Sequence, residues 1–364
     1  MSTDHIDGVP DPAGDLAAAL VELADSVYTD AFRLPYPPIV QRTFDAIVLD
    51  CLRNGGDPPT SVPDLVHRLT AGEDLRPPIT LPAGLIPPAP ALIGAHHLPS
   101  RTCLELASAG AYGRHERVVE ARLAELADIC TPDDFAICRE ILIDNVVIDL
   151  SIGQSLAADP SRSHLWARVK GLYLSEVPAA YITRDRGWRL VATCPVCGFP
   201  APQIAPESWL CETGYCPPTD DPLLRPLDEV CILPVAYRVF LALPGQAERV
   251  IRRRLAEVGI GTTQIPARLT ACTVQRPSGP PSVLRVFDHE QPALLADRLS
   301  LRPDVPEPHD ITVIPDRVID RRPDYIARLT DRLAATARHC VVPEADLESA
   351  IQGRISPDEE GANA

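Results

Sequence analysis

Lysine is almost absent from this chain, since Lys170 is the one lysine among 34 basic residues. Any mechanism that requires a lysine at another position is therefore excluded. Lys170 lacks the upstream glycines of a phosphate-binding loop, so a nucleotide site of that class is excluded as well. The sequence also lacks the glycine pattern of a dinucleotide site, the paired histidines of a zinc protease and the nucleophile elbow of a hydrolase.

Aromatic residues are scarce too, at 5% of the 364 residues, so the cores must consist mainly of Leu, Val, Ile and Ala. The formal net charge of −16 argues against a protein that coats nucleic acid by bulk charge. The longest apolar stretches, 137–152 and 230–243, are too short and too charged to span a bilayer. The polar, acidic start has no secretory pattern, so we expect a cytoplasmic protein without membrane contact.

The length of the chain and its hydrophobic content of 45% predict more than one domain. Residues 1–175 are predicted to be mainly helical, because apolar side chains recur there at helical spacing. A proline-rich connection, 77–99, interrupts this region. The predicted helices are 13–33, 40–53, a short helix capped by Ser61, 117–130, 132–150 (capped by Thr131) and 163–174.

The C-terminal part, residues 226–345, has a different pattern, in which apolar runs of strand type alternate with helical spacing. Its order of elements predicts an α/β domain with a mixed sheet, followed by an acidic tail over 346–364. The expected helices are 230–243, 246–258, 292–300 and 322–339, and the expected strands are 269–275 and 282–288, as a hairpin, and 311–314.

Eleven cysteines without a secretory signal indicate reduced thiols and metal ligands rather than disulfides. Four of them are clustered. Cys194 and Cys197 are separated by two residues, and Cys211 and Cys216 by four. Two pairs at this separation can surround one tetrahedral zinc ion with thiolates. We therefore predict a zinc-ribbon-like module over residues 176–225.

An all-cysteine site is the local option, because no histidine lies between His164 and His289. A site closed by four thiolates has no open coordination position, so the Zn²⁺ would be structural. Two other interpretations stay open, namely four unrelated buried thiols and a redox role for Cys194 and Cys197. The remaining seven cysteines are predicted to be single core residues.

Two polar clusters in the C-terminal part are further candidates. Residues 252–254 are consecutive arginines on a predicted helix, which indicates a solvated face or a contact with phosphate or a partner. Residues 226–350 as a whole are nearly neutral, with 16 arginines and 17 acidic residues. Asp288, His289 and Glu290 end a predicted strand, where acids could bind a divalent metal, although a polar turn is equally ordinary there.

The order of several segments resembles the restriction-endonuclease-like (REase) proteins associated with prokaryotic PIWI-RE (pPIWI-RE) proteins. The resemblance implies a restriction-endonuclease fold and a place in a defence module against foreign nucleic acid, beside a PIWI-like protein and a helicase. It covers roughly residues 130–340, and its segments are Val177–Pro178, the two cysteine pairs, 237–245 leading into the arginine-rich helix, 288–299, 313–316 and 323–325.

The resemblance also implies a catalytic pattern from which this sequence departs. Such nucleases use an aspartate and, on the next strand, an acid-x-lysine motif whose carboxylates hold Mg²⁺. Here the acid position falls at Arg285 and the lysine position at Phe287, and only the following Asp288 is acidic. The earlier strand, 269–275, has no acid. Because an arginine repels Mg²⁺, we expect a nuclease fold whose metal site has decayed.

Three functions are compatible with these observations. The first, which we expect, is a catalytically degenerate REase-like subunit of a pPIWI-RE-type defence system that binds DNA, RNA or a partner protein and is not an enzyme. The second is an active nuclease that uses Asp288, His289 and Glu290 with Mg²⁺ or Mn²⁺. The third is a zinc-stabilised protein-interaction module without a nucleic-acid role.

Overall fold

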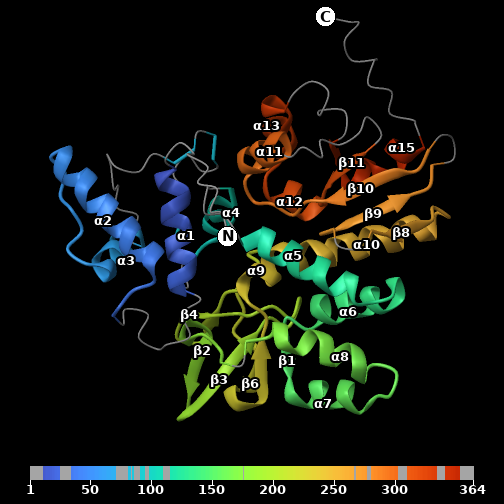
Figure 1. Ribbon diagram of the computed structural model, residues 1–364, viewed down its shortest axis with the longest axis horizontal. Coiled ribbons are helices and arrows are strands. Elements are labelled where there is room, and N and C mark those ends of the chain that lie inside the picture. Colours follow the sequence, from blue (N-terminus) through green and yellow to red (C-terminus); the bar gives the residue numbers. More distant parts are fainter. Residues whose placement is uncertain are drawn as a thin grey trace, which may run out of the picture. The chain divides into compact units, whose positions relative to one another are not determined.

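Figure 1 shows the computed structural model of the chain, which divides into two compact units. One unit comprises residues 1–117 and 178–180, and the other comprises 118–177 and 181–364. No helix in the described part of the chain combines the length and apolarity needed to cross a lipid bilayer. The structure describes residues 11–24, 34–70, 81–82, 84–85, 91–94, 98–109, 115–174, 176–265, 268–276, 280–301, 310–333 and 341–352.

The first unit is helical, as predicted. Helix α1 packs against α2 and α4. The buried Ala19 and Leu23 of α1 share a core cluster with Val40 of α2 and Val62 of α3, so aliphatic side chains at helical spacing hold these helices together. The helices are α1 (Pro12–Ala24), α2 (Pro38–Arg53), α3 (Val62–Thr70) and α4 (Arg101–Ala109).

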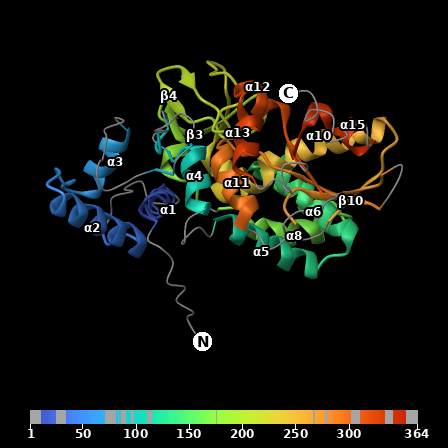
Figure 2. The same cartoon turned by 90° about the horizontal axis from the view of Figure 1, so that it is seen from above.

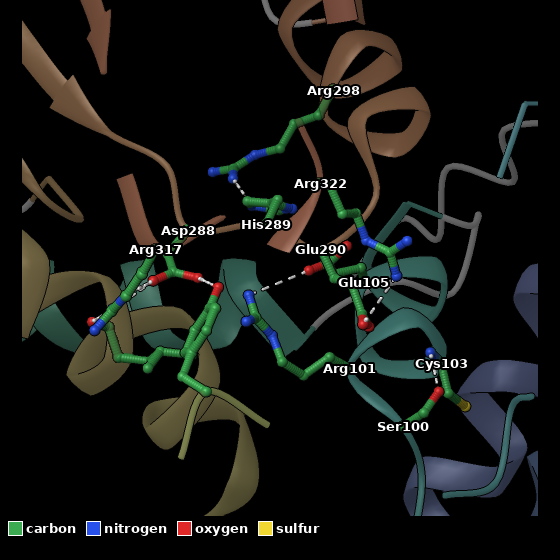
Figure 3. Close-up of polar contacts among 12 residues, drawn as sticks. Ser100, Arg101, Cys103, Glu105, Asp288, His289, Glu290, Arg298, Arg317 and Arg322 are labelled. Atoms are coloured by element: carbon green, nitrogen blue, oxygen red, sulfur yellow. Dashed lines mark hydrogen bonds and ion pairs between the residues drawn. The ribbon is translucent and has the colours of Figure 1, made fainter. Parts of the chain in front are cut away.

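Serine residues cap two of these helices. The Ser61 hydroxyl accepts a hydrogen bond from the amide of Asp64 (3.2 Å), which confirms the predicted cap of α3. The Ser100 hydroxyl accepts one from the amide of Cys103 (3.1 Å) and caps α4, a helix that was not predicted (Figure 3). Residues 25–33 of the first predicted helix and most of the predicted connection 77–99 lie outside the described residues.

The second unit begins with a helical layer that matches the predictions in part: a strand near residue 147 and a helix over 150–158 were not predicted, and the predicted helix over 163–174 ends as a 3-10 turn. The Thr131 hydroxyl accepts from the amide of Asp134 (3.2 Å), as its predicted role as an N-cap requires. The elements are α5 (His115–Asp128), α6 (Pro132–Asp144), strand β1 (Val147–Asp149), α7 (Leu150–Ala158), α8 (Ser163–Val169) and the 3-10 turn η1 (Lys170–Leu172).

The prediction of one helix over 132–150 is wrong at its C-terminal end. Helix α6 ends at Asp144, and β1 pairs antiparallel with β7 (Val230–Ile232). For the same reason the predicted buried helix over 230–243 begins as a strand. A short apolar run is compatible with either structure until it meets a pairing partner. The helical part follows as α9 (Val235–Tyr237), a π-helical turn η4 (Arg238–Ala242) and α10 (Leu243–Glu257).

The cysteine-containing segment forms two small antiparallel sheets, which we call the cysteine module (residues 181–226). Its three-stranded sheet has the order β2-β3-β6, and β4 pairs with β5 as a separate hairpin. The strands are β2 (Ile182–Asp185), β3 (Trp188–Thr193), β4 (Gln203–Ala205), β5 (Ser208–Trp209) and β6 (Leu223–Pro226), flanked by the 3-10 turns η2 (Ala179–Tyr181) and η3 (Leu227–Glu229).

The C-terminal part contains a five-stranded mixed sheet, which confirms the predicted architecture. Its strand order is β12-β11-β10-β9-β8. Strands β8, β9 and β10 pair antiparallel, including the predicted hairpin, and β10, β11 and β12 pair parallel. The strands are β8 (Thr262–Gln264), β9 (Ala271–Val274), β10 (Ser282–Val286), β11 (Ile311–Ile314) and β12 (Val341–Pro343).

Helices cover both faces of this sheet (Figure 2). On one face, Ile251 of α10 shares a core cluster with Leu284 and Val286 of β10. On the other face, Phe287 packs with side chains of α11 (Pro292–Leu301) and α13 (Tyr325–Arg332). Side chains alternate along a strand, so Arg285 and Phe287 point away from α10.

The predicted helix over 322–339 is wrong at both ends, since α13 begins at Tyr325 and ends at Arg332, after which Leu333 has extended backbone (φ −78°, ψ 147°). Helix α12 (Asp316–Arg321) ends before Arg322, whose extended backbone (φ −143°) separates it from α13. Residues 334–340 lie outside the described residues. The chain then continues through β12, the 3-10 turn η5 (Glu344–Asp346) and α15 (Leu347–Ile351), whose Leu347 and Ile351 are buried in the α10 core cluster.

Gly245 of α10 allows a close approach to α6. A Cβ atom at this position would lie 2.6 Å from Cδ1 of Ile143, which is fully buried. Alanine favours helix by about 1 kcal/mol over glycine, but overlap in a packed core costs about 1–3 kcal/mol. We expect Gly245→Ala to lower the free energy of unfolding by about 1 kcal/mol in urea denaturation. Adding Ile143→Val should relieve only part of the overlap, because it removes Cδ1 but leaves Cγ1, which would lie 2.9 Å from the new Cβ atom. A stabilised Gly245→Ala variant would contradict this packing argument.

Candidate functional site

Two glycine turns bring the four clustered cysteines together. The amide of Gly198 donates to the carbonyl of Cys194 (2.9 Å), and the amide of Gly214 donates to that of Cys211 (3.0 Å). Both glycines have left-handed backbone angles, φ +75° and +69°, which other residues adopt only with strain. As a result, the sulfur atoms of the two pairs lie within 4.8 Å of one another. This geometry could hold a metal ion.

The sulfur atoms interact with one another even as free thiols. The Sγ atoms of Cys197 and Cys211 lie 3.4 Å apart. The hydrogen bond from Cys211 lowers the pKa of Cys197 to about 6, while burial raises the pKa of Cys216 to about 12. Without a cation, the neighbouring sulfur atoms cannot all be ionised at once. A bound metal cation would favour the thiolate form of all four, and thiolates rather than thiols are metal ligands. The donor set therefore suits a thiophilic metal.

The remaining cysteines do not converge on this cluster. They were predicted to be single core residues, and those within the described residues are buried or half-buried. Cys51, Cys103, Cys138 and Cys272 are buried, Cys130 and Cys231 are half-buried, and Cys340 lies outside the described residues.

The wider spacing of the second cysteine pair places two extra side chains in contact with the C-terminal part. Glu212 binds Arg238 of η4 through two hydrogen bonds (2.5 and 2.8 Å). Arg238 is almost completely buried and also donates to the hydroxyl of Tyr181 (2.5 Å) and to a main-chain carbonyl. Tyr215 donates its hydroxyl proton to Asp288. Glu212 and Tyr215 therefore join the cysteine turn to the α/β part.

Asp288 is enclosed by these contacts (Figure 3). Its carboxylate is buried and accepts hydrogen bonds from the Tyr215 hydroxyl and from the guanidinium of Arg317, whose Nε lies 2.7 Å away. Arg317 stacks on the ring of Tyr215, 4.8 Å from its centre, and Arg321 lies 5.6 Å from the same ring. Asp288, one of the strand-end acids that the sequence offered as ligands of a divalent metal, is thus neutralised by arginine.

His289 and Glu290 point to different partners (Figure 3). Nε2 of His289 lies 2.8 Å from Arg298, and the carboxylate of Glu290 lies 3.5 Å from Arg322. Each of the three predicted catalytic side chains therefore lies next to an arginine. Among the residues that the structure describes, the four cysteines form the one group of three or more His, Cys, Asp or Glu side chains that converges enough to hold a metal.

Arg285 and Phe287 occupy the positions where the resemblance implies an acid and a lysine. Arg285 lies 3.9 Å from Asp310 as an ion pair. Phe287 is buried, and the guanidinium of Arg298 lies 4.9 Å from the centre of its ring. Neither position offers the oxygen ligand or the ammonium group that Mg²⁺-dependent cleavage needs.

Besides Asp288, the structure contains a buried carboxylate that was not predicted, Glu248 of α10. It has no exposed surface and pairs with Arg139 of α6, which is 2% exposed. The pair connects residues 109 positions apart in the sequence, so helical spacing alone offered no signal for it. Tyr215 and Arg317 were missed for the same reason, although the unusual four-residue spacing between Cys211 and Cys216 was a local hint.

Two segments of the chain match known domain families. Residues 13–149 match the pPIWI_RE three-gene island domain Y, and residues 274–358 match the REase associating with pPIWI_RE. Comparison with curated proteins and with solved structures gave no significant match.

These matches confirm the predicted resemblance to pPIWI-RE-associated REase proteins. They also extend it, because the resemblance read from the sequence began near residue 130 and assigned nothing to the N-terminal helices. The N-terminal match spans helices α1 to α6 and strand β1. The C-terminal match spans β10, α11, β11 and the segment that contains Asp288.

Proposed function

We propose that this chain is a REase-like component of a pPIWI-RE system that does not cut nucleic acid and binds nucleic acid or a partner protein instead. The state of Asp288 carries this proposal. Its side chain is buried and already neutralised by Arg317 and Tyr215. A Mg²⁺ ion bound there would have to displace a guanidinium, and among the described residues Asp288 belongs to no group of three or more potential metal ligands.

The four cysteines support a structural zinc site within the same function. Zinc is the common ion for four thiolates in tetrahedral geometry, and such a site has no open position for a reacting water. Convergence of all four sulfur atoms favours metal binding over a redox role for Cys194 and Cys197 alone. The ion would hold the turn that carries Glu212 and Tyr215 against the α/β part.

The domain families support partner proteins. A three-gene island domain together with a pPIWI-RE-associated REase domain suggests that the chain acts with other products of the same system. We propose a PIWI-like protein and a helicase as those partners and foreign nucleic acid as their common target. Free thiolate ligands fit the reducing conditions of the cytoplasm.

A cleavage assay tests this function. We expect the zinc-loaded, full-length protein to leave single- and double-stranded DNA and RNA intact with Mg²⁺ or Mn²⁺, because the described residues form no cluster of oxygen ligands that could hold either ion. Gel analysis of end-labelled substrates gives the readout, and a chelator-treated sample and Asp288→Ala serve as controls.

Metal-dependent cleavage that Asp288→Ala abolishes would overturn the proposal and establish the second hypothesis. Cleavage that persists in Asp288→Ala would show that the activity comes from elsewhere in the preparation or the chain. If the intact protein retains neither nucleic acid nor the PIWI-like protein in a pull-down, the binding part of the proposal is wrong.

A further inference from the structure

A groove lies beside the C-terminal half of α10, at the edge of the five-stranded sheet. It encloses about 590 Å³ and opens widely to solvent. Three arginines of α10 line it, Arg249, Arg252 and Arg253, together with Gly259, Gly261 and Thr262 of the turn into β8. Strand β8 is the edge strand of the sheet, and α10 contacts both β8 and α6 (Figure 1). None of these residues took part in the site described above.

The helical spacing explains why the three arginines share the groove. Side chains at positions i, i+3 and i+4 lie on one face of a helix, and the arginines at 249, 252 and 253 have this spacing. Glu140 and Ile260 also line the groove, but two glycines of the lining carry no side-chain bulk. A Cβ atom on Gly259 or Gly261 would meet no other atom within 4 Å. A ligand can therefore approach the main chain of this turn closely.

The positive charge in the groove is only partly compensated. Arg249 is paired with Glu140 (3.1 Å) and with Asp144. Arg252 lies 3.8 Å from Glu248, a carboxylate that already pairs with Arg139, and 3.4 Å from the hydroxyl of Thr262.

Arg253 is exposed and forms no ion pair with any residue that the structure describes. Arg252 and Arg253 thus supply an excess of positive charge in a chain whose formal net charge is −16. Such a local excess attracts anions even when the whole protein repels them.

The chemistry of the groove selects phosphate groups on a chain molecule. Guanidinium groups bind phosphate through paired hydrogen bonds. The described lining contains no aromatic side chain on which a base could stack, and a wide opening suits a polymer better than an enclosed small molecule. We propose that this groove binds the sugar–phosphate backbone of a nucleic-acid strand, without reading its sequence. The inference rests on the proposed function and names the surface that performs its binding step.

Binding of a fluorescent single-stranded 20-mer, as DNA and as RNA, to full-length zinc-loaded protein tests the groove by anisotropy. We expect the Arg252→Ala/Arg253→Ala variant to bind about tenfold more weakly, since phosphate contacts by arginine dominate such affinity. For this variant, the slope of log Kd against log salt concentration should be smaller by about 0.7 for each lost phosphate contact with the single strand.

Two further variants make the test specific. Gly261→Glu adds a carboxylate where a Cβ meets no atom and the backbone is not left-handed, so the fold should persist and binding should fall. Arg184→Ala/Arg189→Ala removes the same charge from two exposed, facing positions on β2 and β3 and should bind like wild type. Circular dichroism melting checks that each variant is folded.

Three results would overturn the inference: no binding by wild type, equal losses in the groove and control variants, or unchanged binding by the groove variants. Preferential binding of polyglutamate that depends on Arg252 and Arg253 would assign the groove to an acidic protein segment instead, and would also overturn it. The outcome is separable from the proposed function. Cleavage by the protein would overturn the proposed function but not the proposal that the groove binds nucleic acid. If the groove does not bind nucleic acid, the proposal of a non-cutting protein that binds a partner is unaffected.

Discussion

Replacing Cys211 by serine should abolish binding of the proposed zinc ion and lower the melting temperature of the second unit by on the order of 10 °C. The sulfur of Cys211 lies 3.4 Å from that of Cys197 and 3.1 Å from the hydroxyl of Thr213. Loss of one thiolate from a four-thiolate site removes most of its affinity for zinc. The free energy of metal binding is then no longer available to folding.

The damage should extend beyond the cluster. The turn that Cys211 begins carries Glu212 and Tyr215, the partners of the buried Arg238 and Asp288. If the turn loosens, Arg238 loses its carboxylate partner and Asp288 loses one of its hydrogen bonds, which costs about 1–3 kcal/mol for each group. This coupling is why we expect a larger effect than that of an ordinary buried cysteine.

Two measurements check the prediction, namely zinc content by elemental analysis, expected at about one ion per chain for wild type, and calorimetric melting. Cys231→Ser is the matched control, because Cys231 is a half-buried cysteine of the same unit outside the cluster. It should keep its zinc, and a zinc chelator should make wild type melt like Cys211→Ser. If Cys211→Ser retains full zinc content, the four-cysteine assignment is wrong.

Replacing Arg317 by alanine should lower the free energy of unfolding by about 3 kcal/mol, because it leaves the buried carboxylate of Asp288 without its cation. The side chain of Asp288 has no exposed surface, whereas that of Arg317 is 31% exposed. Most of the free-energy cost therefore comes from Asp288, whose carboxylate is shielded from water. Tyr215 also loses the guanidinium stacked on its ring.

A double-mutant cycle tests whether the effect belongs to this pair. Asp288→Asn in the Arg317→Ala background should recover part of the loss, since it removes the uncompensated charge. Arg328→Ala is the control, because its partner Asp324 is about half exposed like Arg328 itself, and it should change stability by less than about 0.5 kcal/mol. Additive effects of the two substitutions would show that Asp288 and Arg317 do not neutralise each other. A gain of Mg²⁺ binding by Arg317→Ala would show that arginine alone blocks a metal site.

Local signals were sufficient for several parts of this molecule. The caps at Ser61 and Thr131 were predictable because a hydroxyl satisfies an amide three residues away. The cysteine cluster was predictable because its ligands come in two short turns with glycines. The hairpin of β9 and β10 followed from alternation around a turn. The limits predicted for the domains, 1–175, 176–225 and 226–345, stay predictions.

Partners distant in the sequence decided the rest. Residues 147–149 and 230–232 became strands because they pair with each other, although each looked helical by itself. Asp288 and Tyr215 are 73 residues apart, and Asp288 and Arg317 are 29 apart. The sequence could therefore show that Arg285 and Phe287 replace the acid-x-lysine motif. It could not show that the following acid, Asp288, is neutralised by Arg317. Composition and local spacing set the cysteine turns and most helices of this protein, since those depend on neighbours along the chain. Tertiary packing alone decided which charges meet in the interior, because burial turns long-range pairing into a condition for folding.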